Sequence, residues 1–170
     1  MGLFSFIKNA GAKVFGIGKT TEEEAAEARA AANAKAAVEE LRIEEAAARN
    51  LEGTINDLQL QVEGLRIFVD DDMARISGMA YNQATREKVI LVVGNTLGIA
   101  TVDDQMTVEH TEPEAQFHTV ASGDTLGKIA KNYYGNAMKY PVIFEANKPM
   151  LTDPDKIYPG QVLRIPHLNS

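Results

Sequence analysis

The spacing of apolar residues changes period along the chain, and each change marks a predicted element. Residues 21–58 place apolar side chains at helical intervals, first as alanine and from Val38 onward as larger residues. Thr21 with Glu24 forms a capping box that fits the start of this helix. Gly53 is a point at which we expect the helix to bend or end. The alanine-rich part before Val38 has little to bury, so we expect it to be solvated.

Ahead of this helix, residues 3–15 form a short amphipathic segment, also at helical spacing. We expect an N-terminal arm over residues 1–20 whose apolar stripe packs on the next domain. The arm begins with apolar residues, but it lacks the basic start and the length of an export signal. We therefore expect a cytoplasmic protein without stable membrane insertion.

Beyond residue 64 the pattern becomes that of strands. Residues 65–69 and 74–80 alternate apolar and polar positions, and Asp70-Asp71-Asp72 between them predicts a solvated hairpin turn. Asn82 caps a second helix, which Gly94 and Asn95 end with an expected left-handed C-cap. A third strand is predicted over residues 99–108.

A proline-containing linker over residues 111–116 separates this region from a second domain that begins at Phe117. There, Asp124 is expected to cap a helix, and a second helix runs from Tyr140. Pro159-Gly160 predicts a turn before a closing strand over residues 162–165. The predicted class is α+β, with a first domain over residues 21–110 and a second over residues 117–168.

Composition narrows the classes of function. The chain has no cysteine, which excludes disulfides, thiol catalysis and thiolate metal sites. Its net charge is −7, and all of the acidic excess lies in residues 1–112, with 11 Lys and Arg against 19 Asp and Glu. No basic face is evident that would neutralise phosphates, so we expect no nucleic-acid partner.

Two segments resemble known domains. Gly64-Leu65-Arg66-Ile67-Phe68-Val69, Ala74-Arg75-Ile76-Ser77-Gly78 and the run from Val92 to Asp104 are similar to the BON domain, in which a hairpin leads into a helix and a final strand completes a small sheet. The opening at residues 117–130 and the closing segments 143–147 and 157–166 resemble the LysM domain more closely. That resemblance implies two helices on one side of a two-stranded antiparallel sheet.

The combination, together with the Gly2-to-Gly11 start and Lys148-Pro149-Met150-Leu151, resembles the cytoplasmic bacterial potassium-binding protein family. The resemblance covers nearly the whole chain. It departs in the first helix, which is longer and richer in alanine over residues 22–50 than the family pattern. The resemblance implies a bacterial K+ sensor that changes conformation on binding, with Rb+ or Cs+ as further possible ligands and no catalytic activity.

A selective K+ site uses several uncharged carbonyl oxygens in a fixed arrangement. The loop after Gly94 follows a helix end, where the last carbonyls lack intrahelical partners. The family resemblance pairs this loop with the N-terminal arm. On that basis we expect K+ to be held by backbone carbonyl oxygens of five residues: Ile7, Ala10, Gly94, Thr96 and Ile99.

Three alternatives remain open from the sequence. The LysM resemblance implies a groove for N-acetylglucosamine glycans at Gly123, Asp124, Thr125, Leu126, Asn147 and Ile157, and therefore an envelope-associated peptidoglycan adaptor. The long first helix permits a coiled-coil dimer. A third alternative is an accessory module of an enzyme. The sequence indicates no protein partner.

Two patterns that suggest other chemistry do not fulfil its requirements. Asp70-Asp71-Asp72 lacks the alternating ligands and the distant glutamate of a calcium-binding loop. His118, Ser122 and Asp124 lie within seven residues, which is too close for triad geometry unless the fold is built around it. We expect neither a calcium-binding loop nor a catalytic triad at these residues.

Overall fold

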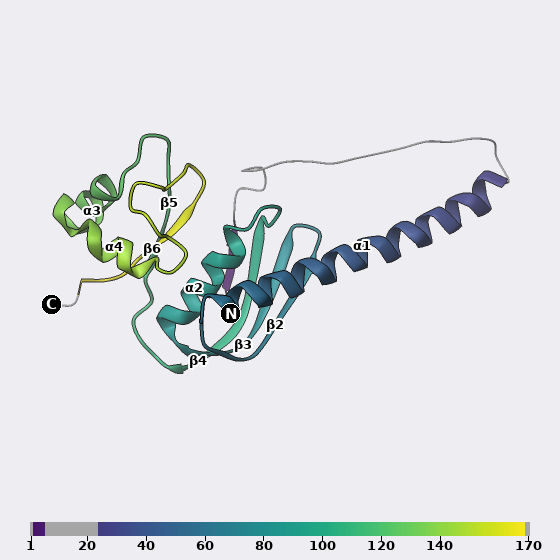
Figure 1. The fold of residues 1–170 in the computed structure, drawn as a ribbon, viewed down its shortest axis with the longest axis horizontal. Helices are drawn as coiled ribbons and strands as arrows, with labels where there is room; N and C mark the ends of the chain where they lie inside the picture. The colour runs from purple at the N-terminus through teal and green to yellow at the C-terminus, as the bar shows by residue number, and fades with distance from the viewer. Residues whose placement is uncertain (1, 6–23, 169–170) are drawn as a thin grey trace.

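The computed structural model describes residues 2–5 and 24–168 and has the predicted α+β class. The N-terminal unit contains β1 (Gly2–Ser5), α1 (Glu24–Asp57), β2 (Val62–Asp70), β3 (Met73–Asn82), α2 (Gln83–Gly94) and β4 (Thr101–His110). The C-terminal unit contains β5 (Gln116–Thr119), α3 (Leu126–Tyr134), the short 3-10 helix η1 (Ala137–Lys139), α4 (Tyr140–Ala146) and β6 (Val162–Ile165). Figure 1 shows the C-terminal unit beside α2.

The four-stranded sheet of the N-terminal unit has the order β1-β4-β3-β2. Strands β2 and β3 form an antiparallel hairpin across the two-residue turn Asp71-Asp72, which confirms the turn predicted there. Strands β3 and β4 are parallel. A parallel pair needs a crossover connection, and α2 provides it.

Helices α1 and α2 share one hydrophobic core with the sheet. Alternate residues of each long strand are buried, so the helices cover one face, as alternating patterns require. The largest fully buried side chains of this core include Ile55, Ile76, Val89, Val93 and Val102. A second, separate core in the C-terminal unit contains Leu126, Ile129, Ile143, Leu163 and Ile165.

Helix α1 extends well beyond the sheet (Figure 1). Every residue from 28 to 43 is exposed, and packing against the core begins only near Ala47 and Ala48. The alanine-rich part is therefore solvated, as expected. The prediction that larger apolar residues pack against the core from Val38 onward is wrong for the first of them, because Val38 and Leu41 are 66% and 56% exposed. The helix also passes through Gly53 without ending there.

The N-terminal arm departs from the prediction. Residues Gly2–Ser5 form an edge strand that pairs antiparallel with β4, instead of the first turn of an amphipathic helix. Phe4 packs against the core while Leu3 is 73% exposed, which is the alternation of a strand. The remainder of the predicted arm, including Ile7 and Ala10, lies outside the described residues.

The C-terminal unit has the predicted β-α-α-β order, with β5 and β6 antiparallel and the Pro159-Gly160 turn before β6. Strand β5 begins at Gln116, one residue before the predicted domain start. Thr125, instead of Asp124, caps α3, and its hydroxyl accepts the Lys128 N–H. Within residues 2–5 and 24–168, no helix has both the length and the apolar character needed to cross a bilayer.

Candidate functional site

The predicted cation ligands that the structure describes lie in the connection from α2 to β4, here called the 94–100 loop. Gly94 is the last residue of α2 and is buried, while Thr96 is half-buried and Ile99 is buried. Asn95 is the C-cap with φ −82°, so the predicted left-handed cap is wrong. Its N–H donates to Leu91 O at 2.9 Å, and the Thr96 N–H donates to Val93 O at 3.1 Å. The helix end is thus closed without a left-handed residue.

A tight turn follows at residues 96–99. The Ile99 N–H donates to Thr96 O at 3.2 Å, and Gly98 has φ +92° in the third position of the turn. A positive φ at this position is the requirement of a type II turn. A carbonyl oxygen has two lone pairs, so Thr96 O retains acceptor capacity beyond this one bond.

The loop is fixed where it enters β4. The N–H groups of Ala100 and Thr101 both donate to Asp72 O, at 2.7 and 3.1 Å. Asp72 lies in the β2–β3 turn, so this end of the loop is held by the hairpin. The side chain of Thr96 donates to Val92 O at 2.7 Å and holds the other end to α2.

Strand β1 ends beside the same loop. Ser5 pairs with Thr101, the first residue of β4, and β1 runs antiparallel to β4. The chain therefore leaves Ser5 at the edge where the 94–100 loop enters the sheet. Of the five predicted cation ligands, the structure brings Gly94, Thr96 and Ile99 into one loop, and it does not describe Ile7 or Ala10.

The side chain of Asn95 connects this loop to the C-terminal unit. Its Nδ2 donates to Val162 O at 2.9 Å, and its Oδ1 accepts the Val162 N–H at 2.8 Å. One amide side chain thus satisfies both backbone groups of the first residue of β6.

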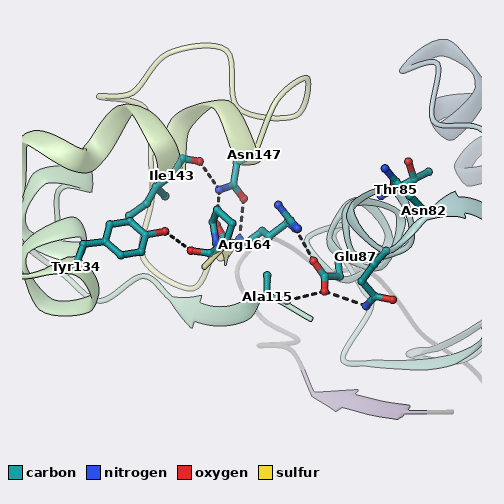
Figure 2. Close-up of polar contacts among 10 residues, drawn as sticks. Asn82, Thr85, Glu87, Ala115, Tyr134, Ile143, Asn147 and Arg164 are labelled. Carbon is teal, nitrogen blue, oxygen red and sulfur yellow. Dashed lines mark hydrogen bonds and ion pairs between the residues drawn. The ribbon is translucent and has the colours of Figure 1, made fainter. Parts of the chain in front are cut away.

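A buried ion pair makes a second connection between the same two elements (Figure 2). Glu87 on α2 is 2% exposed, and its Oε2 accepts from Arg164 Nε of β6. Its Oε1 accepts from Gln83 Nε2 at 2.9 Å and from the Ala115 N–H at 2.8 Å. The carboxylate therefore holds α2, the linker and the C-terminal unit together.

The predicted glycan-binding residues divide into two groups. Asn147 and Leu126 are buried in the C-terminal unit, where the Asn147 amide bonds the backbone of Arg164 on both sides, so neither side chain is available to a glycan. The other four positions are at least partly exposed: Gly123, Asp124, Thr125 and Ile157. The Gly123 carbonyl already accepts from Lys128 Nζ at 2.7 Å.

Asp124 organises the loop before α3 and forms no catalytic triad. Its Oδ2 accepts the Ala121 N–H at 2.9 Å and contacts His118 Nε2 at 3.0 Å. The other ring nitrogen of His118 faces the Tyr133 hydroxyl at 3.3 Å, so Ser122 engages neither nitrogen. The Ala121 N–H and the His118 ring hold the pKa of Asp124 below its ordinary value of 3.8.

The lowered pKa of Asp124 predicts an acid-sensitive C-terminal unit. The folded state binds fewer protons at this carboxyl than the unfolded state, so its stabilising contribution is present above about pH 4 and is lost as the pH falls through the folded pKa. We expect Asp124→Asn to flatten the dependence of melting temperature on pH below pH 4. Asp155→Asn, at an exposed position, is the control, and an unchanged acid dependence in Asp124→Asn would contradict the assignment.

Three carboxylates also gather near the hairpin turn. One oxygen each of Glu40, Glu44 and Asp71 lies within 4.8 Å of the others. Glu44 Oε1 accepts the Asp71 N–H at 3.0 Å, which gives it a structural role in joining α1 to the turn.

The sequence predictions missed Glu87, Asn95 and Arg164 as residues that join the two units. Glu87 lies two positions before the apolar run Val89–Val93 in α2, and only the structure shows that it is buried. Charged residues are rarely buried unless they are paired, so its burial required a cationic partner. The sequence does not say that the partner is Arg164, 77 residues away.

Comparisons with known proteins identify a domain in the C-terminal unit and a relative that matches nearly the whole chain. Residues 118–166 match the family model of the LysM domain. Over 167 residues, covering 98% of this chain and 99% of the relative, the chain is 41% identical to a protein of Escherichia coli O6:H1 (strain CFT073) named "Potassium binding protein Kbp". A stretch of 49 residues, 29% of this chain, is 51% identical to 19% of an uncharacterized protein of Deinococcus radiodurans.

Proposed function

The chain belongs to the family of the potassium binding protein Kbp, and we propose from this premise that it is itself a K+-binding protein. The proposed ligands are backbone carbonyl oxygens of Gly94, Thr96 and Ile99 in the 94–100 loop, with those of Ile7 and Ala10. The 41% identity over nearly the full length of the relative is the observation that carries this proposal.

The chemistry of the 94–100 loop supports the assignment. K+ is a large monovalent cation, and selective sites replace its hydration shell with several neutral carbonyl oxygens. The loop combines a helix end, a tight turn and a fixed entry into β4, so its carbonyls have defined positions. Such preorganisation lowers the entropy lost on binding.

The position of β1 supports the contribution of the N-terminal arm. Ser5 lies beside Thr101, and two further residues of chain span at most about 7 Å. A carbonyl at Ile7 is therefore within chain reach of the 94–100 loop. Ala10 lies five residues beyond Ser5, so the length of the chain between them allows its carbonyl to lie farther from Ser5 than that of Ile7.

The proposal extends to the organisation and role of the protein. The N-terminal unit corresponds to a BON domain over residues 21–110, followed by the linker at 111–116 and the LysM domain. The protein acts as a cytoplasmic sensor without catalytic activity, in which the bound cation stabilises one arrangement of the two units. Rb+ and Cs+, which are close to K+ in size, are expected to bind at the same carbonyls.

Glycan binding is not proposed as a second function of the protein. Two of the six predicted glycan-binding residues, Leu126 and Asn147, are used inside the C-terminal unit. An NMR titration with chitin oligomers tests glycan binding at the remaining four positions. Chemical-shift changes confined to these positions would favour a glycan site: Gly123, Asp124, Thr125 and Ile157.

K+ is expected to stabilise the protein by mass action. At 100 times its dissociation constant, a ligand that binds only the folded state adds about 2.7 kcal/mol to the free energy of unfolding. We therefore expect a higher melting temperature in KCl than in NaCl at equal ionic strength, and saturable heat on calorimetric titration with K+. Equal melting in both salts without calorimetric binding would overturn the proposal.

The site itself is tested with Gly98→Ala. A Cβ at Gly98 meets nothing within 4 Å, so the substitution acts through the positive φ and shifts the turn that carries Thr96 and Ile99. We expect about tenfold weaker K+ binding, equivalent to about 1.4 kcal/mol.

Gly135→Ala is the matched control for that variant. Gly135 also has positive φ and open space, but it lies at the end of α3, away from the 94–100 loop. It should lose stability and retain K+ affinity. Equal affinities of the two variants would place the site elsewhere, and unchanged affinity after deletion of residues 1–11 would exclude Ile7 and Ala10.

A further inference from the structure

Asn95 belongs to two parts of the structure at once. Its main chain ends α2, with its N–H bonded to Leu91 O, and its flanking residues Gly94 and Thr96 carry two of the proposed cation ligands. Its side chain bonds both backbone groups of Val162, which lies 67 residues further along the chain. The peptide groups on either side of Asn95 are therefore oriented jointly by α2 and by β6.

The surroundings of this connection are hollow. A cavity of about 390 Å³ lies between the ends of α1 and α2 and the 149–161 segment, with Asn95, Thr96 and Tyr158 among its lining residues. Side chains therefore do not fill this part of the contact. The two hydrogen bonds between Asn95 and Val162 join the loop to β6 beside this cavity.

The second connection between α2 and β6 lies farther from the loop. Glu87 precedes Asn95 by eight residues, which is about 12 Å along a helix. Its bonds to Arg164 and Ala115 hold the units together without involving Gly94, Thr96 or Ile99. The two connections can therefore be separated by substitution.

We propose that Asn95 is a positioning residue that couples cation occupancy of the 94–100 loop to the docking of the C-terminal unit. A cation that fixes the carbonyls of Gly94 and Thr96 also fixes the Asn95 amide against Val162. Docking of β6 in turn holds the loop in its binding geometry. The inference rests on the proposed K+ function and names the residue that transmits it.

Coupling of this kind is reciprocal, and this reciprocity sets the direction of the expected changes in K+ affinity. If K+ strengthens docking by a given factor, docking strengthens K+ binding by the same factor. Loss of the Asn95 side chain must therefore lower K+ affinity, although the side chain is not itself a proposed ligand.

The test uses the full chain and K+ alone as the probe. In the wild type, amide hydrogen exchange at Val162 should be slower in KCl than in NaCl at equal ionic strength. Asn95→Ala should weaken K+ binding measured by calorimetry by about tenfold and abolish the salt dependence of exchange at Val162. Asn95→Asp, which keeps the acceptor but lacks the donor to Val162 O, should give a smaller loss.

Two controls separate coupling from general loosening. Asn136→Ala removes a side-chain cap of the Met138 N–H at an exposed position and should leave K+ affinity unchanged. The double variant Glu87→Gln/Arg164→Met removes the other connection without leaving a buried charge unpaired, and it should also retain K+ affinity.

The outcomes distinguish this inference from the function on which it rests. A wild type that does not bind K+ overturns both. A wild type that binds K+ while Asn95→Ala retains its affinity and its salt-dependent exchange at Val162 overturns the coupling alone. Equal losses of affinity in Asn95→Ala and in the Glu87/Arg164 double variant would also overturn it, because the whole interface would then carry the effect.

Discussion

Glu87→Gln is expected to lower the free energy of unfolding by about 3 to 5 kcal/mol, the cost of breaking a buried ion pair by removing one partner. The side chains of Glu87 and Arg164 are only 3% and 11% exposed. A neutral glutamine leaves the Arg164 guanidinium buried without its counter-charge. Urea unfolding followed by circular dichroism measures the loss, with both units monitored because two domains need not unfold together.

The double variant shows whether the loss comes from the unpaired charge. Buried ion pairs are often replaceable by neutral residues of similar volume at little cost, so Glu87→Gln/Arg164→Met should recover most of the stability lost in Glu87→Gln. Glu109→Gln, at an exposed glutamate of β4, serves as the matched control. A loss below about 1 kcal/mol in Glu87→Gln would mean that Arg164 reaches solvent without its partner.

Asn147→Ala is expected to destabilise the C-terminal unit by about 3 kcal/mol or more. The Asn147 amide is 1% exposed and makes three bonds: to Ile143 O at 2.7 Å, to Arg164 O at 2.8 Å and from the Arg164 N–H at 2.8 Å. Alanine leaves these backbone groups without partners, at about 1 to 3 kcal/mol for each buried unsatisfied group, and opens a cavity.

Tyrosine fluorescence suits this measurement. The chain has no tryptophan, and four of its five tyrosines lie in the C-terminal unit: Tyr133, Tyr134, Tyr140 and Tyr158. Asn136→Ala is the control, since it removes one exposed cap from the same unit. If Asn147→Ala melted like the wild type, the assigned structural role would be wrong and a ligand-binding role for Asn147 would again be open.

Much of the fold was predictable because it depends on local pattern. The alternation over residues 65–69 and 74–80 with a charged turn between them predicts the β2–β3 hairpin, and Asn82 caps α2 as expected. The closing strand at residues 162–165 has the predicted bounds. Hydrophobic period and capping chemistry act within a few residues, so the sequence displays them directly.

The wrong predictions share a physical cause. A strand at Gly2–Ser5 depends on an open edge of β4, which no pattern within the arm reveals. The left-handed cap expected at Gly94 and Asn95 does not form, and the Asn95 side chain instead bonds Val162. Asp124 yields the capping position to Thr125 and bonds Ala121 and His118. In each case a tertiary partner, or a neighbouring side chain, offers a better bond than the local motif.

The candidate site also has one part that was predicted from the sequence and one part that only the structure showed. The resemblance to a known family indicated K+ and the proposed carbonyl ligands, of which Gly94, Thr96 and Ile99 lie together in one described loop. It did not indicate the hydrogen bonds between Asn95 and Val162, which are visible only when α2 and β6 are seen in contact.

The amino-acid sequence by itself determined the type and order of the main helices and strands from α1 onward, because these follow from periodicity and capping within short windows. The resemblance of its motifs to known domains indicated the family. Only the tertiary structure decided how the two units meet. The bonds from Asn95 to Val162 and from Glu87 to Arg164 join residues 67 and 77 positions apart. Such pairings depend on the docking of complete elements, and no local pattern specifies which buried charge or amide will meet which partner.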